Sequence, residues 1–194
     1  MQALWHIALL PIAEKRAYKN AYGFRPKRSA HDAIQQCFCA LSNRHAATWV
    51  LEGDIKACFD RIDHNWLLAN IPMDKIILEK FLKAGFIEDG KAYPTELGTP
   101  QGGVISPTLA VMALSGLEDK LTDTTEKVRV RKKKKIHMIA YADDFIVTAS
   151  SEQLLREEVI PILREALKEV GLELSSEKTK ITQVQMGFDF LGFV

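Results

Sequence analysis

Apolar and polar residues recur along this chain with two different periods, which predicts a mixture of helices and strands. Apolar residues three or four positions apart predict helices over residues 2–19, 29–41, 64–71, 74–84, 106–121 and 151–170. Short apolar runs bounded by turn residues predict strands over residues 48–55, 85–88, 91–95, 179–184 and 188–193, and a hairpin over 136–149. This order favours an α+β fold, in which an antiparallel sheet of split βαβ-like order carries helices on one face.

Several of the expected helices have recognisable end signals. Ser29 and Asp32 have the spacing of a capping box. The dipeptide Ser106-Pro107 matches an N-cap followed by the first helical residue. Gly171 is placed to end the long helix that begins near residue 151. Pro11 and Pro161 lie inside expected helices and predict a kink or a break at each.

Two carboxylates lie next to each other at the tip of the hairpin expected over residues 136–149. They belong to Tyr141-Ala142-Asp143-Asp144, and a third, Asp54, ends the strand expected over 48–55. Asp54 and Asp143 are 89 positions apart (143 − 54), so only a shared sheet makes them one site. Carboxylates at two strand ends can hold a pair of Mg²⁺ ions for phosphoryl transfer. The alternative is a pair of turn aspartates with a structural role.

Other side chains are candidates for nucleotide binding, and each has a structural alternative. Phe59 could stack under the sugar of a nucleotide and obstruct a 2′-hydroxyl, or it could pack in the core. Arg25, in Gly-Phe-Arg-Pro, could clamp a triphosphate or stabilise a turn. Lys178 could protonate or neutralise a leaving pyrophosphate, or be an ordinary surface lysine. Asp60 and Asp63 are better explained by helix capping or ion pairs.

A glycine-rich segment, Gly98 to Pro107, precedes the helix expected over 106–121. Glycines allow a sugar or a base pair to approach the main chain closely. Gln101 in this segment could donate or accept hydrogen bonds with a template or a nucleotide. An ordinary loop leading into a helix is the alternative, but the length of the coincidence favours a functional loop.

Composition changes this picture only slightly. The chain has 194 residues, 47% of them hydrophobic, and a net charge of +1, so a packed core is expected and strong overall nucleic-acid attraction is not. Three cysteines without metal-type spacing favour a reducing compartment. No apolar run is long enough for a membrane span. Six positive charges within residues 129–135 could contact phosphates or could simply be a solvated hairpin edge.

Taken together and in this order, these motifs resemble those of reverse transcriptases. The resemblance is closest to the group II intron-encoded type, the maturases of bacteria and organelles. It covers nearly the whole chain and rests on residues 22–33, 54–60, 98–107, 141–144, 172–180 and 190–193. It implies a right-hand polymerase palm formed by residues 48–194, with further helices interleaved at about 71–97. Residues 1–47 would form partial helical fingers.

The resemblance also implies roles and ligands. Its catalytic residues would be Asp54, Asp143 and Asp144. Its metal site, for two Mg²⁺ ions with Mn²⁺ as a substitute, would comprise Asp54, Ile55, Asp143 and Asp144. Its nucleotide contacts would be Arg25, Phe59, Gln101, Gly102 and Lys178. Its primer and template contacts would be Pro100, Gly103, Phe190, Leu191 and Gly192. The expected partners are an RNA template, a DNA primer, dNTPs and group II intron RNA, with no membrane.

Family members carry further fingers segments and a helical thumb, which this chain lacks up to its last residue, Val194. We therefore expect a fingers–palm fragment with weak or no processive synthesis on its own. The bacterial cytoplasm or an organellar matrix is the expected compartment.

Three other functions are open on this evidence. One is an RNA-binding splicing cofactor that does not polymerise, and another is a reverse transcriptase recruited to CRISPR spacer acquisition. A generic Mg²⁺ phosphohydrolase is weaker, because it does not explain residues 98–107.

Overall fold

The structure is a computed structural model that describes residues 1–88, 91–93, 97–100, 102–123 and 134–193. Its helices are α1 (Gln2–Arg16), α2 (Ala30–Leu41), α3 (Cys58–Arg61), α4 (His64–Asn70), α5 (Lys75–Leu82), α6 (Ser106–Leu114), α7 (Leu117–Asp123), α9 (Glu152–Leu154) and α10 (Ile160–Glu169). Its strands are β1 (Trp49–Asp54), β2 (Phe86–Glu88), β3 (Lys91–Tyr93), β4 (His137–Tyr141), β5 (Asp144–Ala149) and β6 (Lys180–Gln183).

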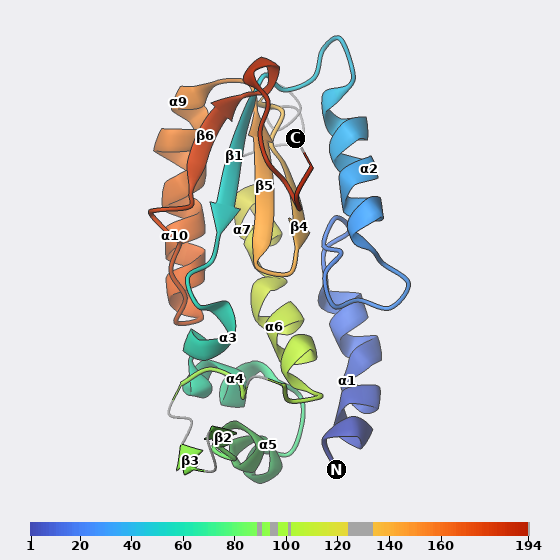
Figure 1. The fold of residues 1–194 in the computed structure, drawn as a ribbon, viewed down its shortest axis with the longest axis vertical. Helices are drawn as coiled ribbons and strands as arrows, with labels where there is room; N and C mark the ends of the chain where they lie inside the picture. The colour runs from blue at the N-terminus through green and yellow to red at the C-terminus, as the bar shows by residue number, and fades with distance from the viewer. Residues whose placement is uncertain (89–90, 94–96, 101, 124–133, 194) are drawn as a thin grey trace.

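The centre of the molecule is a four-stranded antiparallel sheet in the order β4-β5-β1-β6 (Figure 1). β4 and β5 form a hairpin, and β1 lies between β5 and β6. The segment before α2 adds to the outer edge of β4, where Ala21 and Ala140 form a parallel bridge. A separate two-stranded sheet of β2 and β3 lies at the other end of the molecule, near α5 (Figure 1).

Both faces of the central sheet are buried, because alternate side chains of its strands enter two separate cores. On one face Leu51 and Val147 belong to the larger core, which also includes residues of α6, α7 and α10. On the other face Val50 and Ile146 belong to a smaller core, together with residues of α2 and Phe190. The α+β class and the antiparallel sheet are thus confirmed. The cover that α2 gives the second face goes beyond the expectation of helices on one face.

Most expected helices form, but their ends and interiors differ. α1 is continuous through Pro11 and ends at Arg16, three residues before the expected end. The helix expected over 106–121 is divided into α6 and α7 around residues 115–116. The helix expected over 151–170 contains a π-helical turn, Leu155–Val159, just before Pro161. Because proline has no N–H to donate, the hydrogen-bond pattern shifts near that residue instead of breaking the helix.

Two local predictions were wrong. Ser106 is not an N-cap: Ile105 holds that position, and the Ser106 hydroxyl donates to the Pro100 carbonyl instead (2.9 Å). The strand expected over 188–193 is reduced to one bridge between Phe190 and Phe193. The turn expected at residues 89–90, between β2 and β3, lies outside the described residues.

Other capping predictions are confirmed. Ser29 and Asp32 form the expected capping box at the start of α2. Asp63 caps α4 by accepting from the Trp66 N–H (2.7 Å). In the described part of the chain, no helix is both long and apolar enough to cross a membrane.

Candidate active site

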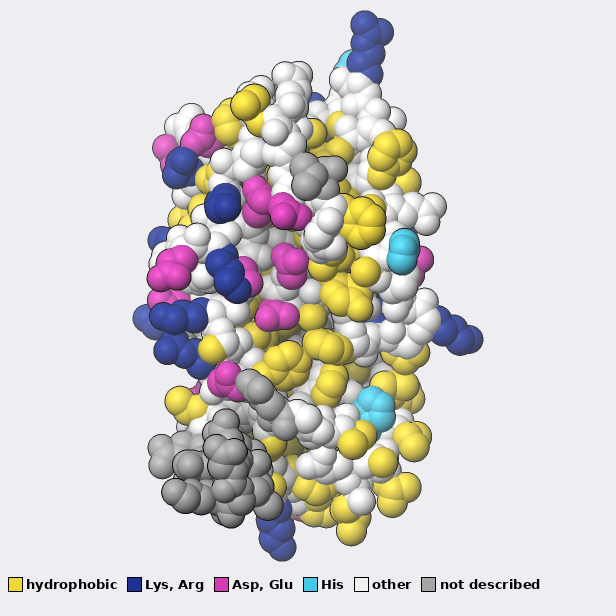
Figure 2. All heavy atoms as spheres, in the orientation of Figure 1, with side chains coloured by type: hydrophobic (Ala, Val, Ile, Leu, Met, Phe, Trp, Pro, Cys, Tyr) yellow, Lys and Arg dark blue, Asp and Glu magenta, His cyan; other side chains and the backbone are white. Residues whose placement is uncertain are grey.

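The sheet brings three carboxylates to one end of neighbouring strands. Asp54, the last residue of β1, is directly opposite Asp144, the first residue of β5. Asp143 lies beside them on the two-residue turn between β4 and β5. Figure 2 shows acidic side chains gathered along the part of the surface that these strands occupy. The sequence prediction that Asp54 and the 143–144 turn would meet in one sheet is therefore confirmed.

The turn that carries Asp143 is fixed by the segment before α2. Ala142 has a left-handed backbone (φ 59), which a residue with a side chain adopts only at a cost. Gly23 packs directly on it: a Cβ built on Gly23 would lie 2.1 Å from the Ala142 nitrogen. Next to this contact, the Tyr22 N–H donates to the Ala140 carbonyl (2.8 Å). The position of the turn thus depends on a residue without a side chain at position 23.

Crowding of negative charge changes the protonation of this site. Burial, followed by the charges of Asp54 and Asp143, raises the pKa of Asp144 to about 6. A hydrogen bond from the Leu191 backbone opposes this rise. Burial, with smaller contributions from Asp143 and Asp54, also raises the pKa of the Cys58 thiol to about 12. The carboxylates therefore form one electrostatic unit that would be relieved by a bound cation.

One positive side chain already contacts this unit. The Lys178 ammonium donates to Asp54 Oδ2 (2.9 Å), and this contact raises the pKa of Lys178. The segment before Lys178 is joined to the end of β1, because the Ser175 N–H donates to the Asp54 carbonyl (2.9 Å). An open pocket between this segment and the β1 end is lined by Asp54, Asp143 and Lys178, among others. The predicted nucleotide contact Lys178 thus lies at the carboxylates.

The donor chemistry of the site suits a hard divalent cation. Carboxylate oxygens are the preferred ligands of Mg²⁺, and their mutual repulsion here supports that fit. The described residues contain no ready-made cluster of three ligating side chains. The Lys178 ammonium would have to leave Asp54 for a cation to use the Oδ2 that it now contacts. The side chain of Ile55 is buried, so that residue could offer an ion only its backbone carbonyl.

The raised pKa of Asp144 makes a stability prediction. Its folded pKa of about 6 exceeds the ordinary value of 3.8, so protonated Asp144 favours the folded state. This contribution to the unfolding free energy is complete below pH 3.8 and is lost as the pH rises through 6. Asparagine does not titrate, so the difference in unfolding free energy between Asp144→Asn and the wild type should rise by about 1 kcal/mol in favour of the variant from pH 4 to pH 8. This figure allows for solvent screening of the half-buried carboxyl group. Urea unfolding in EDTA at both pH values measures the change. An equal difference at both values would contradict it.

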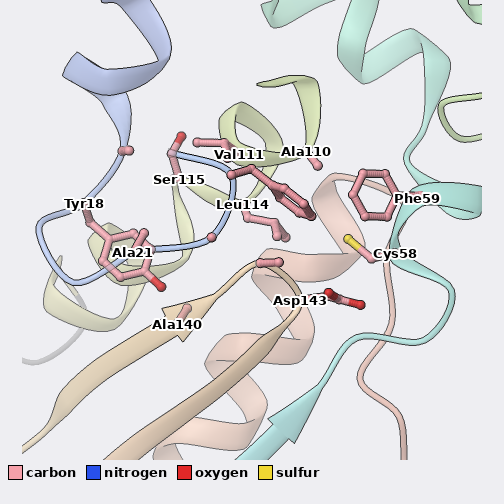
Figure 3. A pocket seen from close by; sticks show the side chains of 14 residues that line it. Tyr18, Ala21, Cys58, Phe59, Ala110, Val111, Leu114, Ser115, Ala140 and Asp143 are labelled. Atoms are coloured by element: carbon pink, nitrogen blue, oxygen red, sulfur yellow. The ribbon is translucent and has the colours of Figure 1, made fainter. Parts of the chain in front are cut away.

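Phe59 lies beside the carboxylates, at one wall of a small apolar pocket (Figure 3). Its ring meets that of Phe24 edge to face, with centroids 5.6 Å apart. Asp143 and Cys58 lie next to Phe59 in the same pocket, and Ala110, Val111 and Leu114 of α6 form another wall (Figure 3). This arrangement places an aromatic ring and an acidic side chain in one pocket.

The glycine-rich segment is tied to the chain around Phe59. Gly98 has a left-handed backbone (φ 76), and a Cβ added there would lie 2.2 Å from the Phe59 carbonyl. The Thr99 N–H donates to the same carbonyl (2.6 Å). Two of the predicted primer and template contacts are joined to each other, because the Gly103 N–H donates to the Pro100 carbonyl (3.1 Å). Gly102, a predicted nucleotide contact, is exposed. Gln101 lies outside the described residues.

The structure does not place Arg25 among the carboxylates. Its guanidinium is buried, with the side chain 6% exposed, and pairs through Nε and NH2 with both carboxylate oxygens of Glu14 (2.9 and 3.0 Å). NH1 donates to the carbonyls of Tyr18 and Ala21 (2.9 and 2.6 Å). This guanidinium connects α1 to the turn that precedes α2. The structural alternative therefore describes the observed contacts better than a triphosphate clamp does.

This difference can be tested by the Arg25→Gln variant. We expect it to lose about 2–3 kcal/mol of unfolding free energy, because Glu14 and two carbonyls lose their donor. Urea denaturation measures this loss. The apparent affinity for dNTP, measured in the fraction that remains folded, should not change. A large loss of nucleotide affinity in a stable Arg25→Gln protein would favour the triphosphate clamp instead.

The C-terminal aromatic segment lies against the second face of the sheet. Phe190 is buried there, with 2% exposure, in the core that includes Tyr22 and Ile146. Leu191 has a left-handed backbone (φ 56), and its backbone contributes the hydrogen bond to Asp144 noted above. Gly192 is exposed (φ 76). Of the three predicted primer contacts, Leu191 thus reaches the carboxylates, while Phe190 packs in a core.

Two contributors were not predicted from the sequence. Gly23 lies within the motif at residues 22–33, and nothing in the sequence indicates that its contact with Ala142 positions Asp143. Glu52 accepts from the Thr182 hydroxyl (2.6 Å) and from the Asp189 N–H (3.2 Å), joining β1 to β6 and to the C-terminal segment. A single glutamate within an apolar strand was the available signal for this second role.

Comparisons with known proteins agree with this geometry. A family profile described as reverse transcriptase (RNA-dependent DNA polymerase) matches residues 1–194. Protein YkfC of Escherichia coli K12 is 32% identical over 221 aligned residues, which cover 96% of this chain and 57% of YkfC. The group II intron-encoded protein LtrA of Lactococcus lactis subsp. cremoris is 30% identical over 257 aligned residues, which cover 100% of this chain and 42% of LtrA. The chain thus spans about half the length of these relatives.

Solved structures show the same fold at low sequence identity. Apo telomerase from Candida tropicalis matches with a TM-score of 0.69 and 14% identity, covering 98% of this chain and 38% of the telomerase. Telomerase from Candida albicans, in complex with a TWJ fragment of telomeric RNA, matches with a TM-score of 0.58 and 15% identity over 94% of this chain and 32% of that one. These similarities confirm the expected polymerase-like α+β fold.

Proposed function

Because this chain belongs to the reverse transcriptase family, we propose that it forms the fingers and palm of an RNA-directed DNA polymerase of the group II intron-encoded type. The observation that supports this most is the meeting of Asp54, Asp143 and Asp144 at one end of the sheet. Residues 1–47 would be the partial fingers, and residues 48–194 the palm with its interleaved helices. The substrates would be dNTPs, a DNA primer and an RNA template.

The carboxylates have the chemistry that nucleotidyl transfer needs. Asp54, Asp143 and Asp144, with the Ile55 carbonyl, would hold two Mg²⁺ ions, or Mn²⁺ as a substitute, which neutralise charge and lower the pKa of the attacking 3′-hydroxyl. Lys178 contacts Asp54 (2.9 Å), and this lysine would neutralise or protonate the leaving pyrophosphate. The β4–β5 turn and Gly23 hold Asp143 in position while this occurs.

Phe59 would select the sugar. Its ring lines the same pocket as Asp143 and contacts the Phe24 ring edge to face. A ring in that position would meet the 2′-hydroxyl of a ribonucleotide and leave a deoxyribonucleotide untouched. Gly102, Gly103 and Pro100 would let the template or the nucleotide approach the main chain.

Sugar selection gives the proposed function a direct test. We expect the Phe59→Val variant to accept ribonucleotides with a relative efficiency roughly 10- to 100-fold higher than the wild type, because a steric barrier is removed. The ratio of kcat/KM for dTTP and UTP on an RNA template measures this. The Phe38→Val variant is a matched control, since Phe38 is 70% exposed on α2. An unchanged ratio in Phe59→Val would contradict the assignment.

A second function, binding of intron RNA during splicing, is favoured by the relationship to LtrA, a group II intron-encoded protein. Such binding does not need the three aspartates. A splicing assay with the Asp143→Ala variant separates the two functions: retained splicing with lost DNA synthesis would mean that the chain has both. Loss of both at once in a folded protein would argue against a separate role in splicing.

A further inference from the structure

A groove with several basic side chains lies between α2 and β4. It is open to solvent and lies between the C-terminal half of α2, the loop that follows it and the beginning of β4. We refer to it as the α2–β4 groove. Its charged and imidazole side chains are Arg44, His45, Lys135 and His137, and no acidic residue is among the described residues that line it. The groove therefore offers positive charge without a competing carboxylate.

Lys135 is held in a fixed place in this groove. Its ammonium donates to the Ala46 carbonyl (2.8 Å), which joins the start of β4 to the loop after α2. Its own carbonyl accepts from the Thr148 hydroxyl (2.9 Å). The neighbouring Lys134 differs, because it forms an ion pair with Glu158. The basic run at 129–135 therefore ends in two lysines with different roles, and only Lys135 is among the residues lining the groove.

The groove is well separated from the candidate active site. His137 begins β4, while Asp143 follows the end of that strand. The extended chain from His137 to Tyr141 alone corresponds to roughly 13 Å. In Figure 1 the loop after α2 and the β4–β5 turn lie at opposite ends of the sheet. A ligand in this groove would thus bind without touching the carboxylates.

We propose that the α2–β4 groove binds the sugar–phosphate backbone of RNA at a site separate from the catalytic centre. Arg44 can donate two parallel hydrogen bonds to a phosphate, and Lys135 can add a point charge. The lining includes no Phe, Tyr or Trp among the described residues, and phosphate contacts carry no sequence information, so binding should depend little on sequence. The same lack of aromatic anchors disfavours a protein partner.

The test compares two double variants in an RNA-binding assay. Arg44→Gln with Lys135→Gln removes two charges from the groove. Lys83→Gln with Arg156→Gln is the matched control, because each removes a charge from an exposed i,i+4 ion pair elsewhere. Fluorescence anisotropy with a labelled 20-nucleotide oligo(U) and with a 20-base-pair RNA duplex, at 50–200 mM KCl, distinguishes single-stranded from duplex RNA.

We expect the groove variant to bind at least one of these RNAs about tenfold more weakly at 50 mM KCl. The slope of log K against log[KCl] should become less steep by about 1.4 for a single strand, because each lost phosphate contact contributes about 0.7. The control variant should keep the wild-type slope. The Arg44→Gln single variant, which leaves the Lys135 contact with Ala46 intact, should show about half of the change and guards against a folding defect.

Equal slopes for the groove and control variants would overturn the proposal. So would equal losses in both, or binding of poly-glutamate in preference to RNA, which would indicate an acidic protein partner. The binding assay is repeated with the Asp143→Ala protein, in order to separate RNA binding in the groove from the catalytic carboxylates. An effect of Arg44→Gln that persists there supports the groove even if the chain proves not to polymerise.

Discussion

The Asp54→Asn variant is expected to lose nucleotide addition by about 10³-fold or more, since removing a carboxylate from such a site costs several kcal/mol of transition-state stabilisation. Asp54 is opposite Asp144 in the sheet and contacts Lys178, so its charge serves both the proposed metal site and the lysine. The rate of single-nucleotide addition to a DNA primer on an RNA template measures the loss. The change should not reduce the stability of the fold, because it relieves repulsion between carboxylates.

Asp60→Asn provides the matched control for this change. Asp60 lies six positions after Asp54, on α3, and its side chain is exposed. We expect this control to keep a rate within a few-fold of the wild type. A rate for Asp54→Asn within a few-fold of the wild type would contradict the assignment of Asp54 as a catalytic carboxylate. Equally large losses in both variants would mean that the general negative charge of this region matters, and not a specific site.

The Gly23→Ala variant is expected to lose about 2–3 kcal/mol of unfolding free energy, because the added Cβ must displace backbone atoms and not a flexible side chain. The added Cβ would lie 2.1 Å from the Ala142 nitrogen, so the segment that must move is the turn that carries Asp143. A shift of about 1 Å in a catalytic group costs about 100-fold in rate, and we expect a loss of that order here. Urea unfolding and single-nucleotide addition, measured on the same protein, test both effects.

Gly116→Ala is the matched control, because a Cβ at Gly116 would meet nothing within 4 Å. It should change stability by no more than about 0.5 kcal/mol and leave the rate unaltered. A Gly23→Ala protein as stable and active as this control would show that the β4–β5 turn does not depend on the segment before α2.

The centre of this fold could be predicted from the sequence because its signals are local. Apolar runs around Asp143 and before Asp54 predicted the strands, and their hairpin order predicted the meeting of the carboxylates. The capping box of Ser29 and the N-cap role of Asp63 follow from short-range hydrogen bonds. The strands and the caps depend on residues only a few positions apart, which is where sequence patterns carry most information. The meeting of the carboxylates follows from pairing these strands in one sheet.

The features that were missed depend on contacts that exist only once the chain is folded. Ser106 has the right neighbours for an N-cap, but its hydroxyl is taken by the Pro100 carbonyl in the folded loop. Arg25 resembles a phosphate ligand in its motif, but Glu14 lies within reach on α1. Phe190 belongs to an expected strand, but its ring packs in the smaller core. Only the bridge between Phe190 and Phe193 remains of that strand. In each case a tertiary partner determined the outcome.

The most direct test of the central claim is Mg²⁺-dependent primer extension on poly(rA)/oligo(dT). It compares this chain alone, the chain supplied with the part of the L. lactis relative that lies outside the match, and the Asp143→Ala variant with the same supplement. We predict weak or no processive synthesis by the chain alone, clear synthesis when the supplement is present, and none by the variant. Synthesis that survives Asp143→Ala, or no synthesis under any condition, would contradict the claim that these carboxylates form a polymerase active site.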